Sequence, residues 1–191
     1  MGECYMVLVP NTVLGAWVGD DTSEFTTLVP GQLVGFPLGV LMLGGNDTVL
    51  GSTDSEQING NQGQDQLAGA AGFDTLFGGR DSDTLDGQAD SDFLFGNVGT
   101  DLLRAGNGDD RLFGGKDGDI LFGDFGNDIL SGDDGIDVVT GGEGADLFVL
   151  PQSGLSTDFI SDFEDGIDRM VLPNGLSFSN LQILPRGLIK P

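Results

Sequence analysis

The sequence predicts an all-β fold: a parallel β-roll, or β-solenoid, in which short strands and turns wind into stacked coils. Three observations predict it. The middle of the chain repeats every nine residues, 34 of the 191 residues are glycine, and 31 acidic residues face only 7 basic ones. Most of the acids are Asp, whose short side chain suits tight turns and tolerates left-handed backbone. We therefore expect about six 18-residue coils with β caps at both ends.

The repeat is defined by an acid at every ninth position, without insertion or deletion. The twelve acids are Asp47, Glu56, Asp65, Asp74, Asp83, Asp92, Asp101, Asp110, Asp119, Asp128, Asp137 and Asp146. An apolar residue stands two positions after each acid, and Gly or Asp stands two positions before it. From Glu56 onward, Gly also stands five positions before the acid, except at Ala105.

A period of nine fits half of a flattened coil, with a six-residue turn followed by a three-residue strand. One apolar residue per repeat points inward while its neighbours point outward, as strand alternation requires. Two repeats close one coil, and stacked coils form two parallel sheets over a rod on the order of 30 Å long. The sequence thus divides into an N-terminal capping segment (1–41), twelve repeats (42–149) and a C-terminal cap with a possible secretion signal (150–191).

Stacking places acids that are 18 residues apart in columns, about 4.8 Å from one another. Neighbouring carboxylates at that distance repel by roughly 3–4 kcal/mol at an effective dielectric of 20. The glycines let the turn backbone reach positive φ and direct its carbonyls to the same place. This all-oxygen environment suits calcium better than magnesium, which demands a rigid octahedron. With no His and one Cys, nitrogen and sulfur ligands do not compete.

The full pattern is Gly-Gly-x-Gly-x-Asp-x-apolar-x, seen best at Gly114–Asp119, Gly123–Asp128 and Gly141–Asp146. It resembles the haemolysin-type calcium-binding repeats of the RTX family. The resemblance implies that each ion lies between two turns on the same side, bound by repeat Asp side chains and turn carbonyls, with up to about ten ions. The implied ligands are Asp47, Asp65, Asp74, Asp83, Asp92, Asp101, Asp110, Asp119, Asp128, Asp137 and Asp146, with Gly78, Gly108, Gly114, Gly115, Gly123, Gly126, Gly132, Gly135, Gly141, Gly142 and Gly144.

Several positions depart from the pattern. Glu56 replaces Asp, and its longer side chain puts the flanking sites in doubt. Asp stands where Gly is expected at Asp54, Asp81, Asp90 and Asp117. These four are either substitutions that the left-handed region tolerates or additional ligands, and the sequence leaves both alternatives open.

The flanking segments carry weaker signals. Segment 1–41 alternates short apolar runs with Pro and Gly, a pattern that favours short strands. Glu3 argues against a Sec signal. The run Gln32–Leu43 is too short and too interrupted to span a membrane. The stretch Asp158–Asp168 resembles the segment that follows RTX repeats as a cap, where further acids hold an ion. The family resemblance also implies type I export, and therefore an extracellular or cell-surface location.

The composition narrows the function. Without His there is no Ser-His-Asp triad, and so few basic residues argue against nucleic acid. We expect a calcium-binding structural, matrix or surface protein that folds with calcium, and not an enzyme. The alternatives are a non-catalytic module of a larger secreted hydrolase or epimerase, or an adhesin or oligomerisation module. Phe77, Phe95 and Phe113 fall 18 apart on an outer face, where a terminal segment, another copy, a partner protein or a glycan could cover them.

Overall fold

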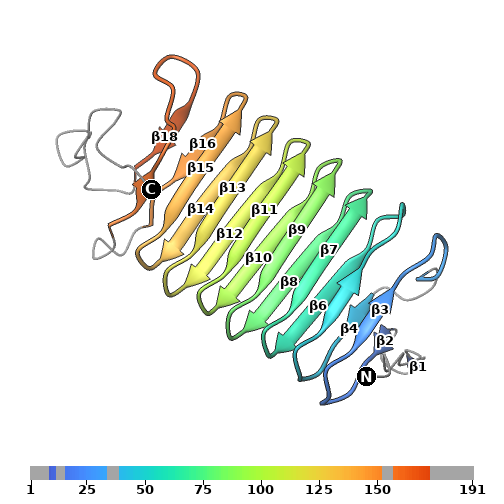
Figure 1. The fold of residues 1–191 in the computed structure, drawn as a ribbon. Helices are drawn as coiled ribbons and strands as arrows, with labels where there is room; N and C mark the ends of the chain where they lie inside the picture. Colours follow the sequence, from blue (N-terminus) through green and yellow to red (C-terminus); the bar gives the residue numbers. More distant parts are fainter. Residues whose placement is uncertain (1–8, 12–15, 34–38, 152–156, 173–191) are drawn as a thin grey trace.

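The computed structural model describes residues 9–11, 16–33, 39–151 and 157–172, and these form two β-sheets without a helix, parallel except for one antiparallel pair at the N-terminal end (Figure 1). In spatial order, the larger sheet contains β1 (Val9–Asn11), β2 (Ala16–Val18), β4 (Val40–Leu41), β6 (Gln57–Gln62), β8 (Thr75–Arg80), β10 (Phe93–Val98), β12 (Arg111–Lys116), β14 (Ile129–Asp134), β16 (Leu147–Val149) and β18 (Arg169–Val171). The smaller contains β17 (Phe159–Ile160), β15 (Val138–Glu143), β13 (Ile120–Phe125), β11 (Leu102–Asn107), β9 (Thr84–Ala89), β7 (Gln66–Ala71), β5 (Thr48–Leu50) and β3 (Phe25–Thr27).

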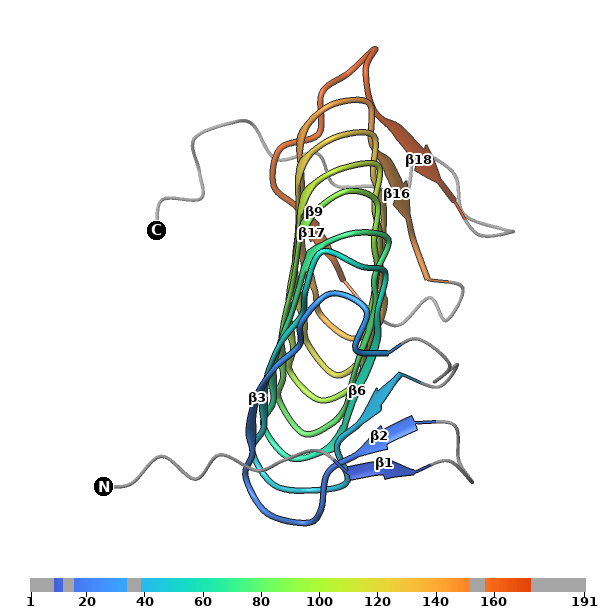
Figure 2. The same ribbon diagram turned by 90° about the vertical axis from the view of Figure 1, so that its right-hand side faces the viewer.

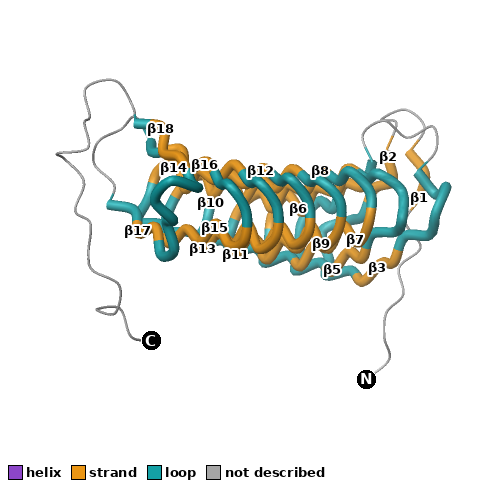
Figure 3. The backbone as a smooth tube through the Cα atoms, turned by 90° about the horizontal axis from the view of Figure 1, so that it is seen from above, coloured by secondary structure: helices purple, strands orange, loops and turns teal. Residues whose placement is uncertain are grey.

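From β2 onward, successive strands alternate between the two sheets, so the chain winds as a flattened coil (Figure 2). Leu76 pairs with Leu94 and Leu94 with Leu112, each 18 residues apart in a parallel register. Seen from above, the strands line two sides of a rod and turns close its edges (Figure 3). The predicted parallel β-roll with an 18-residue coil is confirmed.

The strands in the middle of the rod are longer than predicted. Each has six residues, as in β8, whereas the period alone predicted three. Pairing with the next coil runs through Thr75, Leu76 and Phe77, skips Gly78, and resumes at Gly79 and Arg80. Gly79 has φ +122°, so the backbone turns a corner there and still pairs with the neighbouring coils. The prediction from the nine-residue period included only the residues that alternate between inward and outward positions, so it did not include the paired residues after this corner.

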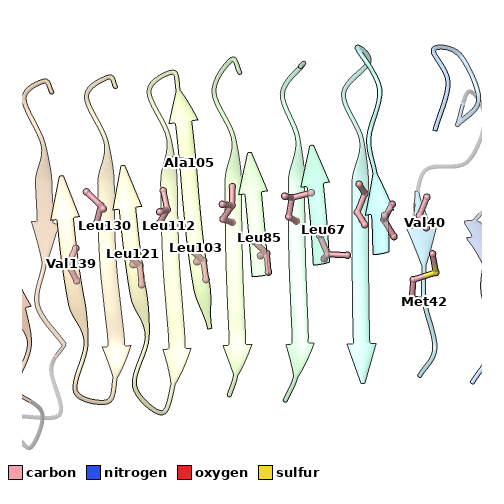
Figure 4. Packing of buried hydrophobic residues seen from close by; sticks show 14 of the residues in the cluster. Val40, Met42, Leu67, Leu85, Leu103, Ala105, Leu112, Leu121, Leu130 and Val139 are labelled. Atoms are coloured by element: carbon pink, nitrogen blue, oxygen red, sulfur yellow. The ribbon is translucent and has the colours of Figure 1, made fainter. Parts of the chain in front are cut away.

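The core is one apolar side chain thick on each sheet. The apolar residue that follows each acid by two positions is buried, and these side chains fill the space between the sheets (Figure 4). Full burial of a Leu side chain contributes about 1.5–3 kcal/mol. Because each coil buries only two such residues, a coil depends on its neighbours for stability.

The sheets continue beyond the regular repeats at both ends. Phe25 pairs with Thr48, 23 residues later, Val138 with Phe159, 21 later, and Leu147 with Arg169, 22 later. These spacings break the period of nine, so the sequence did not mark these strands as part of the coil. Among the described residues there is no helix with the length and hydropathy needed to cross a membrane.

Candidate metal centre

The repeat acids form two hydrogen-bonded ladders along the rod. The main-chain N–H of each acid donates to Oδ1 of the acid one coil further on, as Asp83 does to Asp101 at 2.8 Å. One ladder contains Asp47, Asp65, Asp83, Asp101, Asp119 and Asp137. The other contains Glu56, Asp74, Asp92, Asp110, Asp128 and Asp146. The two predicted columns are therefore brought together as expected.

One oxygen on every ladder Asp remains without a partner. The carbonyl of Asp83, for example, accepts the N–H of Leu102 at 2.9 Å, so the main chain and Oδ1 are satisfied. Its Oδ2 is buried and has no hydrogen-bond partner. The same holds for Asp47, Asp65, Asp74, Asp92, Asp101, Asp110, Asp119, Asp128, Asp137 and Asp146. A buried oxygen left unbonded on so many equivalent residues is a strong sign of a ligand.

Burial raises the pKa of the ladder Asp carboxyls. These side chains are at most 2% exposed. Desolvation raises the pKa of Asp83 to about 7 and that of Asp119 to about 8, and the charges of Asp101 and Asp137 add to the shift at Asp119. The mutual repulsion expected from the sequence contributes to these pKa shifts, but desolvation is their larger cause. In the ionised form these groups require a counter-charge.

In most repeats a glycine stands five positions before the acid and leaves space for the unbonded oxygen. A Cβ on Gly96 would lie 2.4 Å from Oδ2 of Asp101 and 2.5 Å from the carbonyl oxygen of Gly114 in the next coil. A Cβ on Gly123 would meet the same two kinds of oxygen at 2.3 and 2.4 Å. Positive φ does not explain these glycines, because neither adopts it. A carboxylate oxygen and a main-chain oxygen thus face the same side of the glycine.

The position two before the acid adopts left-handed backbone in every repeat except at Asp54 and Gly135. Gly126 has φ +136°, and a Cβ there would lie 1.6 Å from the carbonyl oxygen of Gly108. Where Asp replaces Gly, φ falls to +74° at Asp81 and Asp90. The expected tolerance for Asp is confirmed, also at Asp117, whose φ is +76°.

The Asp side chains at this position bond to the main chain of the preceding coil. Oδ2 of Asp81 accepts the N–H of Gly63 at 3.3 Å, and Oδ2 of Asp90 accepts that of Gly72 at 3.1 Å. Oδ2 of Asp54 accepts the N–H of Gly31. These bonds give three of the four substitutions a role in joining coils.

Comparison with known proteins identifies the repeat. The RTX calcium-binding nonapeptide repeat matches overlapping stretches at residues 43–76, 59–94, 68–103, 95–130 and 122–149. The matched region covers more than half of the chain and coincides with the regular coils. The chain belongs to the RTX calcium-binding repeat family. No curated protein matches it significantly.

The chemistry of this RTX coil fits calcium. Nowhere in the described ranges do three or more acidic or sulfur-bearing side chains converge on one point. A cation between turns would therefore be bound by few carboxylates and several main-chain carbonyls. Calcium accepts six to eight such oxygens in flexible geometry, whereas structural zinc sites are four-coordinate and built mainly from Cys and His.

All glycines implied as RTX carbonyl ligands lie in the strand corners or turns beside these ladders. Gly78, Gly114, Gly123, Gly132 and Gly141 stand five positions before an acid, Gly115 and Gly142 four, and Gly108, Gly126, Gly135 and Gly144 two. Their placement agrees with the implied set, while their role as ligands stays a prediction.

Glu56 differs from the RTX Asp positions because its carboxylate is fully bonded. Its N–H donates to Asp74 in the usual way, at 2.7 Å. Its carboxylate folds back onto its own turn, where Oε2 accepts the N–H of Ser52 at 3.1 Å and Oε1 accepts the Ser52 hydroxyl. The longer side chain thus bonds both of its oxygens within its own turn and leaves no oxygen free for a ligand.

Three further acids extend the RTX ladders, and the repeat register does not include them. The N–H of Glu24 donates to Oδ1 of Asp47 at 2.7 Å. At the other end, Oδ1 of Asp158 accepts the N–H of Asp137 at 3.5 Å, and Oδ1 of Asp168 accepts that of Asp146 at 3.0 Å. In the sequence, the acidic segment Asp158–Asp168 pointed to the two acids at the C-terminal end. For Glu24 the only sequence feature that could have indicated a ladder position is Gly19, five residues before it.

Proposed function

We propose that this RTX protein binds several calcium ions between its stacked turns and folds together with them. The observation that carries the proposal is the row of eleven buried Oδ2 atoms without hydrogen-bond partners. Those Asp residues, with main-chain carbonyls of the turns beside them, would hold the ions. Calcium would supply the positive charge and coordination that the buried carboxylates require.

Binding of this kind supplies the free energy of folding. At ~2 mM calcium and a Kd of ~0.1 mM, each ion stabilises the folded state by ~1.8 kcal/mol. About ten ions would then contribute ~18 kcal/mol, more than the total stability of a typical domain. We infer that the coils are disordered without calcium, because burying so many charged carboxylates would then be unfavourable.

A structural role outside the cell or at its surface is the function that fits best. Sites in this affinity range fill at the millimolar calcium of extracellular fluid and not at cytosolic levels. RTX β-rolls are typically non-catalytic, and the acids of this one are already engaged in ladder bonds. The alternative, a repeat module within a larger secreted hydrolase or epimerase, is supported by the same site and differs only in what is attached to it.

A contact role for the outer Phe stripe stays a separate prediction. Phe77, Phe95 and Phe113 stack on β8, β10 and β12, with ring centroids 5.0 and 5.1 Å apart and nearly parallel planes. Stacking between coils accounts for the half-buried state of these rings. A glycan, a partner protein or a second copy is therefore not needed to explain them.

Calcium titration tests the main proposal. We expect isothermal titration calorimetry to show several ions bound and far-UV circular dichroism to show sheet appearing as calcium is added to chelator-treated protein. Magnesium at the same concentration is the control and should restore little sheet, because it requires a rigid octahedron. An unchanged sheet signal in excess chelator, together with no heat of calcium binding, would overturn the proposal.

A further inference from the structure

The turn before β3 reproduces the repeat site outside the matched region 43–149. Glu24 is only 4% exposed, and its Oε2 is buried without a hydrogen-bond partner. Its N–H donates to Oδ1 of Asp47, whose own Oδ2 is also buried and unbonded. Glu24 therefore has the same main-chain bond and the same unbonded oxygen as every Asp of the ladders.

The backbone around Glu24 also matches the regular turns. A Cβ on Gly19 would lie 2.6 Å from Oε2 of Glu24, as a Cβ on Gly96 would lie 2.4 Å from Oδ2 of Asp101. The second neighbour differs, because Gly19 faces the sulfur of Met42 at 2.9 Å where Gly96 faces the carbonyl oxygen of Gly114 at 2.5 Å. The carbonyl oxygen of Thr22 lies 2.3 Å from the Cβ position of Gly45, and this repeats the stacking of turn carbonyls seen in the middle of the rod. Residues 19–24 thus form a repeat-type turn, although their sequence Gly-Asp-Asp-Thr-Ser-Glu does not match the repeat.

The charges at this turn favour a cation. Oε1 of Glu24 accepts the Thr22 hydroxyl at 3.1 Å and the N–H of Asp20 at 3.4 Å, which leaves Oε2 directed at the space beside Gly19. The first basic residue of the chain is Arg80, so no Lys or Arg precedes it in the sequence to neutralise the site. Two adjacent buried carboxylates without a counter-charge are strongly unfavourable.

We propose an additional calcium site between the turns of Glu24 and Asp47, formed by their unbonded carboxylate oxygens and nearby main-chain carbonyls. It rests on the proposed calcium function of the repeats and extends it to a turn that the repeat pattern does not include. Glu56 heads the other ladder and provides the contrast, because both of its carboxylate oxygens bond to Ser52. The chain thus holds one leading Glu that can bind an ion and one that cannot.

Terbium, a luminescent substitute for calcium, tests the site in the full chain. Trp17 is the only tryptophan, and it lies in β2, two residues before the turn that starts at Gly19. Energy transfer from tryptophan to terbium falls steeply with distance, so emission excited through Trp17 reports on this end of the rod. We expect wild-type protein to show this emission and excess calcium to suppress it.

Glu24→Gln should reduce the emission several-fold and lower the calcium stoichiometry by one. Glu56→Gln is the matched control and should change neither, while Glu24→Asp should retain the emission because Asp occupies the equivalent position in the other turns. Circular dichroism at saturating calcium verifies that each variant folds. Wild-type protein that binds neither calcium nor terbium would overturn the proposed function itself. Wild-type protein that binds calcium and terbium but shows no tryptophan-excited emission, or a folded Glu24→Gln variant with unchanged emission and stoichiometry, would overturn this site alone.

Discussion

The coils in the middle of the rod and those at its ends share one hydrogen bond but differ in the number of residues that it spans. In the middle, the acid N–H donates to a carboxylate 18 residues further on at 2.7–2.9 Å. At the ends, the same bond spans 23 residues from Glu24, 21 from Asp137 and 22 from Asp146, at 2.7, 3.5 and 3.0 Å. The ladder bond therefore defines a coil more reliably than the nine-residue period does.

The difference follows from the number of neighbours. A middle coil is packed between two others, so its turns have no room for extra residues, and a side chain two positions before the acid is accommodated only at a smaller φ, as at Asp81. Gly126 shows this, since the carbonyl of Gly108 occupies the space where its Cβ would be. Gly166 near the C-terminal end also has positive φ, +88°, yet no atom lies within 4 Å of its Cβ position. The nine-residue period is therefore kept where a coil is packed between two neighbouring coils and is lost where it is not.

Changing pH in the absence of calcium should give the largest effect. In the folded state, desolvation raises the pKa of Asp83, Asp92 and Asp128 to about 7 and that of Asp119 to about 8, from 3.8. Their protonation therefore stabilises the calcium-free fold fully below about pH 4, and this contribution is lost as pH rises through 6 to 8. Each pKa unit corresponds to ~1.4 kcal/mol, so several such groups change stability by several kcal/mol.

We expect circular dichroism in excess chelator to show more sheet at pH 5 than at pH 8. The calcium-loaded protein is the control and should respond in the opposite sense, since protons compete with calcium for the same oxygens and raise the calcium midpoint at low pH. At the N-terminal end the hydroxyl of Thr22 lowers the pKa of Asp20, so that exposed acid should not contribute. Equal sheet content at both pH values in chelator would contradict the assignment of raised pKa to the ladder.

Gly126→Ala and Gly166→Ala compare the two regions directly, at two glycines that both have positive φ. Gly126→Ala should cost about 2–3 kcal/mol, because left-handed strain adds to a clash with the Gly108 carbonyl that is relieved only if φ shifts from +136° toward the +74° of Asp81. Gly166→Ala should cost only about 1–2 kcal/mol, the strain of left-handed backbone alone. Urea unfolding in saturating calcium measures both, and equal losses would show that enclosure by neighbouring coils does not govern glycine use.

Much of the fold and the site could be predicted because the regular coils repeat one local rule. The acid at every ninth position and the apolar residue two positions later predicted the two ladders and the core, and both are found. The glycine five positions before the acid was expected for its backbone freedom, yet its main use is to make room for a carboxylate oxygen. That use depends on atoms from the next coil, which no single repeat encodes.

The parts that could not be predicted lie where the spacing changes. Glu24 joins a ladder through a partner 23 residues away, so no periodic pattern connects the two. The closure at Glu56 depends on one methylene group, which lets the carboxylate reach back to Ser52. Both features arise from the geometry at an end of a ladder, where an acid lacks the neighbour that the repeat assumes.

Asp101→Asn and Asp168→Asn should separate ligand oxygens from structural ones. Asn retains Oδ1 and the bond from Asp83, but it removes the charge of the unbonded oxygen at position 101. Because this carboxylate lies between two coils, we expect a loss of about 2–4 kcal/mol in calcium-dependent stability, equivalent to one or two ions. Calorimetry should show one or two fewer calcium ions bound.

At Asp168 both carboxylate oxygens already accept main-chain bonds, from Asp146 at 3.0 Å and Glu164 at 2.7 Å. Asp168→Asn should therefore cost about 1 kcal/mol for one lost hydrogen bond and leave the calcium stoichiometry unchanged. If both variants lost the same number of ions, bonding of the second oxygen would not distinguish ligands from structural acids.

Phe95→Ala and Phe163→Ala should give the smallest effects and compare the outer surfaces of the two regions. Phe95 stacks between Phe77 and Phe113, whereas Phe163 near the C-terminal end has a tilted contact with Phe148, with ring centroids 5.9 Å apart. At about 0.5–1.5 kcal/mol per aromatic pair, Phe95→Ala should cost about 1–3 kcal/mol and Phe163→Ala about 1 kcal/mol. Urea unfolding in calcium measures the loss, and calcium stoichiometry should not change in either variant.

The same pair of variants decides what the Phe stripe is for. If stacking between coils is its role, light scattering should give the same molar mass for Phe95→Ala as for the wild-type protein, because only the stability of the coil has changed. A lower molar mass for Phe95→Ala, with Phe163→Ala unaffected, would show instead that the stripe on β8, β10 and β12 joins two copies. In that case the stacked rings would form a contact surface, and the middle of the rod would differ from its ends in association as well as in packing.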